Sequence, residues 1–383
     1  NFTIPGPFYF VNMSQVMASS PEQLKKLIAI NRAKYISFWE MRANNVPEAD
    51  NRAVLAYGNA LWIPQMEKTR HEAQTAIAKL HALNSGVKAT VYIHCFFNGF
   101  EASGDQSFKD SWVTGFSGKR AQSVYSSKTN YPYRTVYPGR NNTFGKLFHR
   151  SLDFYLNTLK VDWLYWDESN GPGATAKNNK GASNVTFNDW DGYSAVIDPK
   201  TNRIDKKFAS LPLLSRDVFK FAIKKIYAKP GGLILFNGPA TTACRLKTLS
   251  MAESQDHIVR CYSTHLNTPL AYGFGTPKFS AIVERLNYGC LYVRTHLNYS
   301  CDAVTKFYPF TPLEIHKGWV KGQERIITNK SGKFGWTGKF KARIWAYDKN
   351  GKKLEPNPTT TNYRDKANIT VSEGGLSILE KIE

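Results

Sequence analysis

The chain has 383 residues, of which 42% are hydrophobic and 14% aromatic, and its formal net charge is +21. This content of large apolar side chains excludes a disordered chain, and the length suffices for one large domain and a smaller one. No run of 18 or more apolar residues occurs, which excludes a membrane-spanning helix.

The positive charge is spread along the chain, and no compact basic arm is present. Such a charge predicts attraction to a polyanion, either nucleic acid or an acidic polysaccharide. No nucleic-acid-binding motif accompanies the charge, so we expect no nucleic acid as partner. A generally basic surface without a specific partner is the other interpretation.

The glycosylation sequons and the cysteines indicate where in or outside the cell the protein is expected. Seven Asn-x-Ser/Thr sequons are typical of a secreted glycoprotein, and we expect that location. The five cysteines are odd in number and include no C-x-x-C pair, so neither a zinc site nor a thioredoxin-type site is expected. The first residue is Asn1, from which we expect a mature or truncated chain. The oligomeric state is not indicated.

In the first half of the chain, apolar strands alternate with amphipathic helices. Strands are expected at residues 7–13, 35–40, 89–94 and 161–167, and helices at residues 21–32, 67–83 and 144–159. A long loop is expected at residues 99–140. A second excursion, residues 171–214, is too polar for a core and is typical of a lid or rim.

The alternation continues with strands expected at residues 233–237, 249–253, 258–265 and 290–296 and helices at 216–228 and 279–286. Eight strands joined by helices predict an α/β fold, a (β/α)8 TIM barrel over residues 1–305. A doubly wound sheet is the alternative, but no G-x-G-x-x-G follows the first strand. Short strands between Gly- and Asn-containing turns predict a small antiparallel β domain over residues 306–383.

Polar side chains end most of the predicted strands, and the carboxyl ends of barrel strands meet at the face where such folds place their chemistry. The fourth strand ends in two adjacent acids, Asp167 and Glu168, and the sixth ends in Glu253. Further residues near the strand ends are expected to bind substrate: Glu40, Arg42, His94, Trp166, Asn237, His265, Arg294 and His296.

The two arginines suit a sulfate or carboxylate on the substrate, although a salt bridge to Glu40 or another acid explains them equally well. His94, His265 and His296 fit no metal-binding motif, so neither a metal nor a cofactor is expected.

Two carboxyl groups that flank one bond are what glycoside hydrolysis requires. The segment Tyr165-Trp166-Asp167 resembles the nucleophile segment of retaining α-galactosidases and α-glucosidases. This resemblance implies a (β/α)8 barrel followed by an antiparallel β domain, with Asp167 as nucleophile and Glu253 as acid/base. The sequence departs from the family by having Glu where the acid/base is usually Asp, and Glu168 competes with Asp167 for its role.

The leading hypothesis is a secreted glycoside hydrolase that cleaves a polysaccharide or glycan by a two-carboxylate, retaining mechanism. An acidic or sulfated substrate is compatible with the net charge. Two alternatives stay open. One is a non-catalytic carbohydrate-binding or structural glycoprotein on a degenerate hydrolase barrel. The other is a polysaccharide lyase with a Tyr or His base beside an Arg or Lys.

Overall fold

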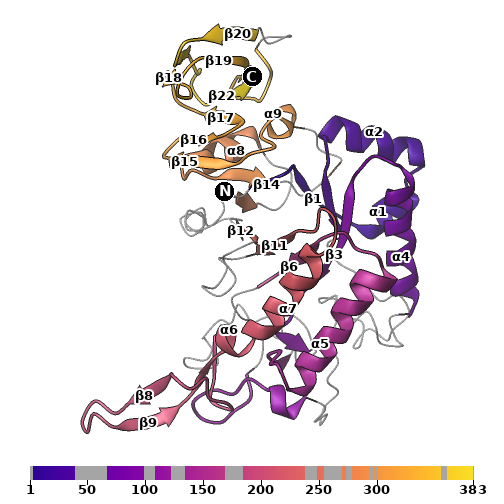
Figure 1. Cartoon of the computed structure of the whole chain (residues 1–383), viewed down its shortest axis with the longest axis vertical. Helices are drawn as coiled ribbons and strands as arrows, with labels where there is room; N and C mark the ends of the chain where they lie inside the picture. Colours follow the sequence, from indigo (N-terminus) through magenta and orange to yellow (C-terminus); the bar gives the residue numbers. More distant parts are fainter. Residues whose placement is uncertain are drawn as a thin grey trace.

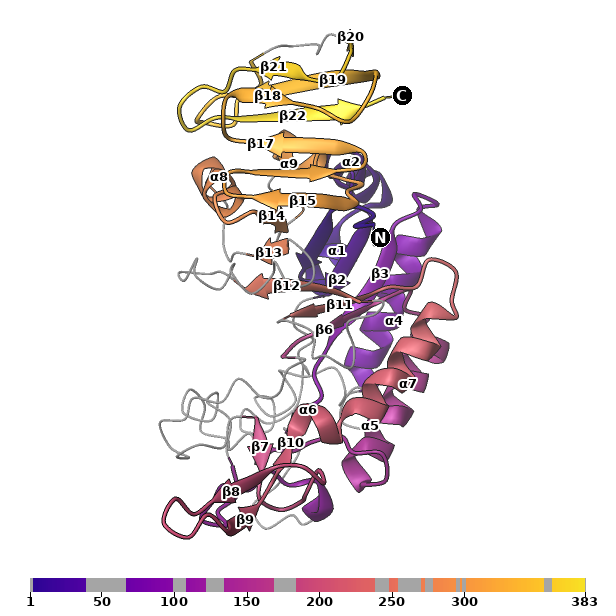
Figure 2. The same cartoon turned by 60° about the vertical axis from the view of Figure 1, so that its left-hand side comes forward.

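The structure is a computed structural model of the whole chain, shown in Figures 1 and 2. The residues that it describes are 3–38, 67–98, 108–121, 134–168, 184–237, 248–253, 270–272, 278–293, 297, 301–354 and 360–382.

Eight parallel strands form the central sheet. They are β1 (Phe8–Val11), β2 (Tyr35–Phe38), β3 (Lys88–Ile93), β6 (Leu164–Trp166), β11 (Ile234–Asn237), β12 (Leu249–Glu253), β13 (Leu270–Tyr272) and β14 (Leu291–Val293), in this spatial order. The sheet curls as it twists along this order (Figure 2). The strand order is the one that a barrel requires, because each strand pairs with the next along the chain.

Two features differ from the barrel predicted above. The seventh parallel strand is β13, which the sequence did not predict, and the predicted seventh segment, residues 258–265, lies outside the described residues. Within the described ranges, β14 and β1 are not paired, so the structure shows a curled half-barrel. A closed eight-stranded barrel stays a prediction.

Helices cover the outer face of the first five strands (Figures 1 and 2). They are α1 (Met13–Ala18), α2 (Pro21–Asn31), α4 (Glu67–Ala82), α5 (Thr143–Asp153), which continues into a π-helical turn at Phe154–Thr158, and α7 (Arg216–Tyr227). Helix α2 begins with a cap at Ser20, where the hydroxyl of Ser20 and the side chain of Gln23 accept hydrogen bonds from each other's backbone N–H groups.

Alternation along each strand divides the core into two layers. Ile36, Val91 and Trp166 pack outward against the helices, in one buried cluster. Phe10 and Tyr165 belong to the cluster on the inner, concave side, where their rings lie 4.6 Å apart. Side chains two residues apart on a strand share a face, so the inner cluster fixes which polar residues at the strand ends point inward.

The C-terminal part of the chain is an antiparallel β structure, as predicted. Its main sheet has the order β15 (Pro312–His316), β16 (Trp319–Gly322), β17 (Arg325–Thr328), β22 (Leu376–Lys381), β19 (Phe340–Tyr347) and β20 (Thr360–Tyr363). Strands β18 (Gly332–Phe334) and β21 (Ala367–Ile369) form a separate pair. The helices α8 (Phe279–Leu286) and α9 (Asp302–Thr305) precede this sheet. Val320, Ile327 and Ile378 join the inner cluster, so the two sheets share one core. The boundary between residues 305 and 306 stays a prediction.

No helix in the described parts of the chain is long and apolar enough to cross a membrane.

Candidate functional site

The carboxyl ends of β3, β6 and β11 bring five polar residues together: Tyr92, His94, Asp167, Glu168 and Asn237. The positions follow from strand alternation. Tyr165 and Leu235 lie in the inner cluster, and Asp167 and Asn237 follow each of them by two residues. Three neighbouring strands thus aim their last polar side chains at one place on the concave side.

Asp167 lies at the centre of this group. Its Oδ1 accepts hydrogen bonds from Asn237 Nδ2 at 2.6 Å and from the Glu168 N–H at 2.9 Å. Its Oδ2 accepts a short hydrogen bond from the Tyr92 hydroxyl. The donors come from the strands on both sides of β6, so they fix the orientation of the carboxylate. Hydrogen bonds to a carboxylate also stabilise its ionised form.

Glu168 turns toward a different partner. Its φ of 47° is left-handed, an uncommon conformation for a residue with a side chain, and it marks the exit from β6. Its Oε2 lies 3.0 Å from Nε2 of His94, which is fully buried. Nδ1 of His94 accepts the Phe96 N–H at 3.0 Å, so the ring proton sits on Nε2 and is donated to Glu168. His94 therefore acts here as a neutral donor.

Trp166 was expected from the sequence to bind substrate, but the structure places its side chain in the core. Its side chain is fully buried on the outer side of β6, where it stacks on Phe219 with the ring centres 4.4 Å apart. Phe148 and Phe236 pack around the same ring. Alternation explains the placement, because Trp166 lies between two inward-facing residues, Tyr165 and Asp167. The indole packs on the outer side of β6, on the face opposite to the one that carries Asp167.

The remaining predicted residues are not placed in the site. Glu253 is the last residue of β12, but its side chain is outside the described part of the structure. The other predicted residues lie wholly outside the described ranges: Glu40, Arg42, His265, Arg294 and His296. Their contribution to substrate binding stays a prediction.

Tyr92 is a site residue that the sequence analysis missed. The signal was its spacing of two residues from His94 on one strand, which places both side chains on the same face. A tyrosine within an apolar strand is indistinguishable in sequence from a core residue, and only the pairing of β3 with β6 brings its hydroxyl to Asp167.

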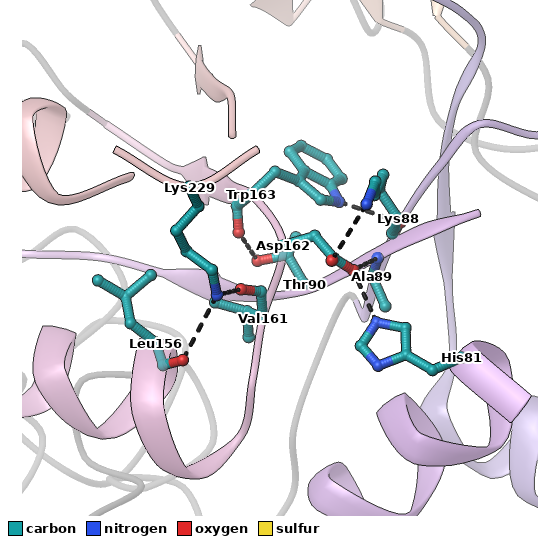
Figure 3. Close-up of polar contacts among 9 residues, drawn as sticks. All are labelled: His81, Lys88, Ala89, Thr90, Leu156, Val161, Asp162, Trp163 and Lys229. Atoms are coloured by element: carbon teal, nitrogen blue, oxygen red, sulfur yellow. Dashed lines mark hydrogen bonds and ion pairs between the residues drawn. The ribbon is translucent and has the colours of Figure 1, made fainter. Parts of the chain in front are cut away.

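The opposite end of β6 carries a second acid with a different environment (Figure 3). Asp162 Oδ2 lies 2.7 Å from His81 Nε2 on α4 and accepts the Ala89 N–H at 2.9 Å, and Lys88 Nζ lies 3.5 Å from Oδ1. Burial alone would raise the pKa of Asp162, but these hydrogen bonds and charges outweigh it and lower the pKa. Asp162 therefore ties α4 and β3 to the amino end of β6, where barrels place stabilising residues.

Among the described residues, no three His, Cys, Asp or Glu side chains come together in a way that would hold a metal ion.

Comparison with known proteins finds similarity in fold but none in sequence. No protein-family model matches the sequence, and no curated protein is similar enough in sequence to match. A type I pullulanase from Bacillus subtilis, solved with maltose, superposes with a TM-score of 0.51 at 8% identity, covering 98% of this chain and 70% of that one. The chain therefore shares the fold of this pullulanase over nearly its whole length.

Two further structures are similar at lower scores. An α-amylase from Geobacillus thermoleovorans with acarbose has a TM-score of 0.47 at 8% identity, covering 99% of this chain and 98% of that one. A GH31 family sulfoquinovosidase from E. rectale with an aza-sugar inhibitor has a TM-score of 0.48 at 11% identity, covering 98% and 62%.

Proposed function

We propose that this protein is a glycoside hydrolase that cleaves a polysaccharide or glycan, with Asp167 as the carboxylate that attacks the sugar. The observation that carries the proposal is the placement of Asp167. It ends the central strand on the concave side, and donors from the strands on both sides of it hold its carboxylate. The shared hydrolase fold supports this reading.

In the proposed reaction, an oxygen of Asp167 attacks the anomeric carbon while the bond to the leaving oxygen breaks. The leaving oxygen takes a proton from a second carboxylic acid. We assign that role to Glu253, which ends β12, two strands from β6 in the sheet. Water then attacks the glycosyl–enzyme bond and gives a proton to Glu253, which releases the sugar and restores Asp167.

Glu168 is the competing carboxylate, and its surroundings favour another role. Its carboxylate is held by His94 on one oxygen, away from the donors that orient Asp167. A carboxylate held in this way is suited to accept a hydrogen bond from a sugar hydroxyl. We therefore assign attack to Asp167 and substrate orientation to Glu168.

The test compares wild type, Asp167→Asn and Glu168→Gln on neutral and sulfated glycans, with new reducing ends as the readout. Asp153→Asn is a matched control, because Asp153 is a half-exposed carboxylate on α5 that is paired only loosely with Lys225, at 3.4 Å. We expect Asp167→Asn to lose activity by on the order of 10⁴-fold or more and Asp153→Asn to keep it. Full activity in Asp167→Asn would refute the assignment.

A second measurement separates attack from general-base catalysis. Asp167→Ala is given an aryl glycoside and sodium azide. Recovery of activity, with formation of a glycosyl azide, is expected if Asp167 is the nucleophile. If wild type cleaves no glycan but binds glycans on an array, the non-catalytic carbohydrate-binding alternative replaces the hydrolase.

A further inference from the structure

An arm extends from the end of the molecule opposite the C-terminal sheet (Figures 1 and 2). We use this name for residues 108–121 and 184–210. It contains the pairs β7 (Val185–Thr186) with β10 (Ala209–Ser210) and β8 (Ala195–Ile197) with β9 (Ile204–Lys207). The two segments follow β3 and β6, so both leave the sheet at the carboxyl ends, where His94 and Asp167 lie.

Hydrogen bonds join the two segments into one body. Thr114 N–H donates to Thr186 Oγ1 at 3.1 Å, and Phe187 N–H donates to Thr114 O at 3.0 Å. Asp191 holds the base of the hairpin by accepting the N–H groups of Tyr193, Ser194 and Ser210. Burial would raise the pKa of Asp191, but these bonds lower it, which keeps the carboxylate ionised at neutral pH.

The arm exposes a large share of the apolar side chains that the described residues leave open to solvent. Of the eleven described large hydrophobic side chains that are exposed, five belong to the arm: Phe116, Trp190, Tyr193, Ile197 and Ile204. Tyr193 is 87% exposed and Trp190 is 44% exposed. The indole of Trp190 is held in place because its Nε1 donates to Ser194 O at 3.1 Å. The indole of Trp190 is therefore preorganised at the surface, and the described part of the chain leaves both rings uncovered.

Two lysine side chains lie over aromatic rings of the arm. Lys207 Nζ lies 3.9 Å from the ring centre of Trp190, and Lys206 Nζ lies 4.9 Å from that of Phe116. The arm has seven Lys and Arg and five Asp residues. Four of these carboxylates accept hydrogen bonds from backbone or hydroxyl groups in the arm or beside it: Asp110, Asp189, Asp191 and Asp198. Within the described ranges, neither Lys206 nor Lys207 has a carboxylate partner.

Exposed rings lie beside ammonium groups that no carboxylate of the described residues neutralises, and this combination restricts the partner. A net charge of +21 on each chain opposes association of two copies. An anionic sugar polymer matches both features, because the C–H face of a pyranose packs on an aromatic ring and its sulfate or carboxylate is attracted to an ammonium group.

We infer that the arm binds an anionic polysaccharide chain, with Tyr193 and Trp190 as stacking platforms and Lys206 and Lys207 as contacts for the charged substituents. This inference rests on the proposed function, because it makes the arm a remote binding region for the polymer that the site would cleave. Both arm segments follow the strands β3 and β6 in the chain, and the carboxyl ends of these strands carry the site.

Binding is measured in the Asp167→Asn background, so that cleavage does not interfere, with dextran sulfate and unsubstituted dextran as matched probes. Tyr193→Ala is expected to weaken binding of dextran sulfate about 10-fold, and Tyr193→Phe, which keeps the ring, to bind as before. Lys207→Gln is expected to weaken binding of dextran sulfate, Lys207→Arg to retain it, and added salt to reduce it. Thermal melting confirms that each variant is folded.

The outcomes for the arm and for the site are separable. The arm inference is wrong if Tyr193→Ala binds dextran sulfate as tightly as its Asp167→Asn parent does. It is also wrong if the parent does not bind dextran sulfate at all. Neither outcome depends on what the wild-type protein cleaves. Loss of binding in Tyr193→Ala without cleavage by wild type supports the arm and overturns the hydrolase. If Tyr193→Ala instead dissociates a dimer in sedimentation, or abolishes binding to phosphatidylserine vesicles, the occupant is a second copy or a membrane, and the inference is wrong.

Discussion

The acid at the amino end of β6 provides a quantitative test of the fold. Replacing Asp162 by Asn keeps its shape but removes the charge that His81 and Lys88 face across 2.7 Å and 3.5 Å. A hydrogen bond to a charged, mostly buried group contributes about 1.5–3 kcal/mol, so we expect a loss of about 2 kcal/mol. At about 2 cal/mol/K per residue, this lowers the Tm of a 383-residue chain by about 2–3 °C.

The effect has a defined pH dependence. The folded pKa of Asp162 is lowered below its ordinary value of 3.8, so its stabilisation is present above that pH and is lost as pH falls through the folded pKa. Urea unfolding of wild type and Asp162→Asn is measured at pH 7 and at pH 3, and the difference between them should shrink at pH 3.

The matched control is Asp153→Asn, because the ion pair between Asp153 and Lys225 is about half exposed. Such pairs contribute at most about 1 kcal/mol. Equal losses for Asp162→Asn and Asp153→Asn at pH 7, or a loss for Asp162→Asn that persists unchanged at pH 3, would refute the reasoning.

Two further predictions concern the site and the outer layer. Tyr92→Phe removes the hydroxyl that donates to Asp167 and should lower kcat about 10-fold on any cleaved glycan without lowering Tm; unchanged kcat would exclude a positioning role for the hydroxyl. Gly145→Ala places a Cβ 1.8 Å from Gly139 O, a backbone atom, and should cost more than about 3 kcal/mol in urea unfolding. Gly118→Ala meets no atom within 4 Å and, at a φ of 77°, should cost only about 1 kcal/mol; equal losses for the two would contradict the packing argument.

Local sequence patterns were sufficient to predict many of the helices and strands. The cap at Ser20 and the apolar spacing of α2 act within a few residues, and the structure places the helix where they predict it. The run of apolar and aromatic residues before Asp167 likewise predicts β6, because a strand buried on both faces needs such side chains on both. Strand β13 has the same length as β6 but stands between Pro269 and Gly273 in the sequence, without the longer apolar and aromatic run that marks β6.

The adjacent acids at the end of β6, and their place on the carboxyl side of a parallel strand, were determined by the sequence itself. Only the tertiary structure decided what surrounds them. It gave Asp167 its donors Tyr92 and Asn237, and it turned Trp166 outward into the core. The physical reason is that secondary structure depends on neighbours in the chain, whereas hydrogen-bond partners of a site come from strands 70 or more residues apart.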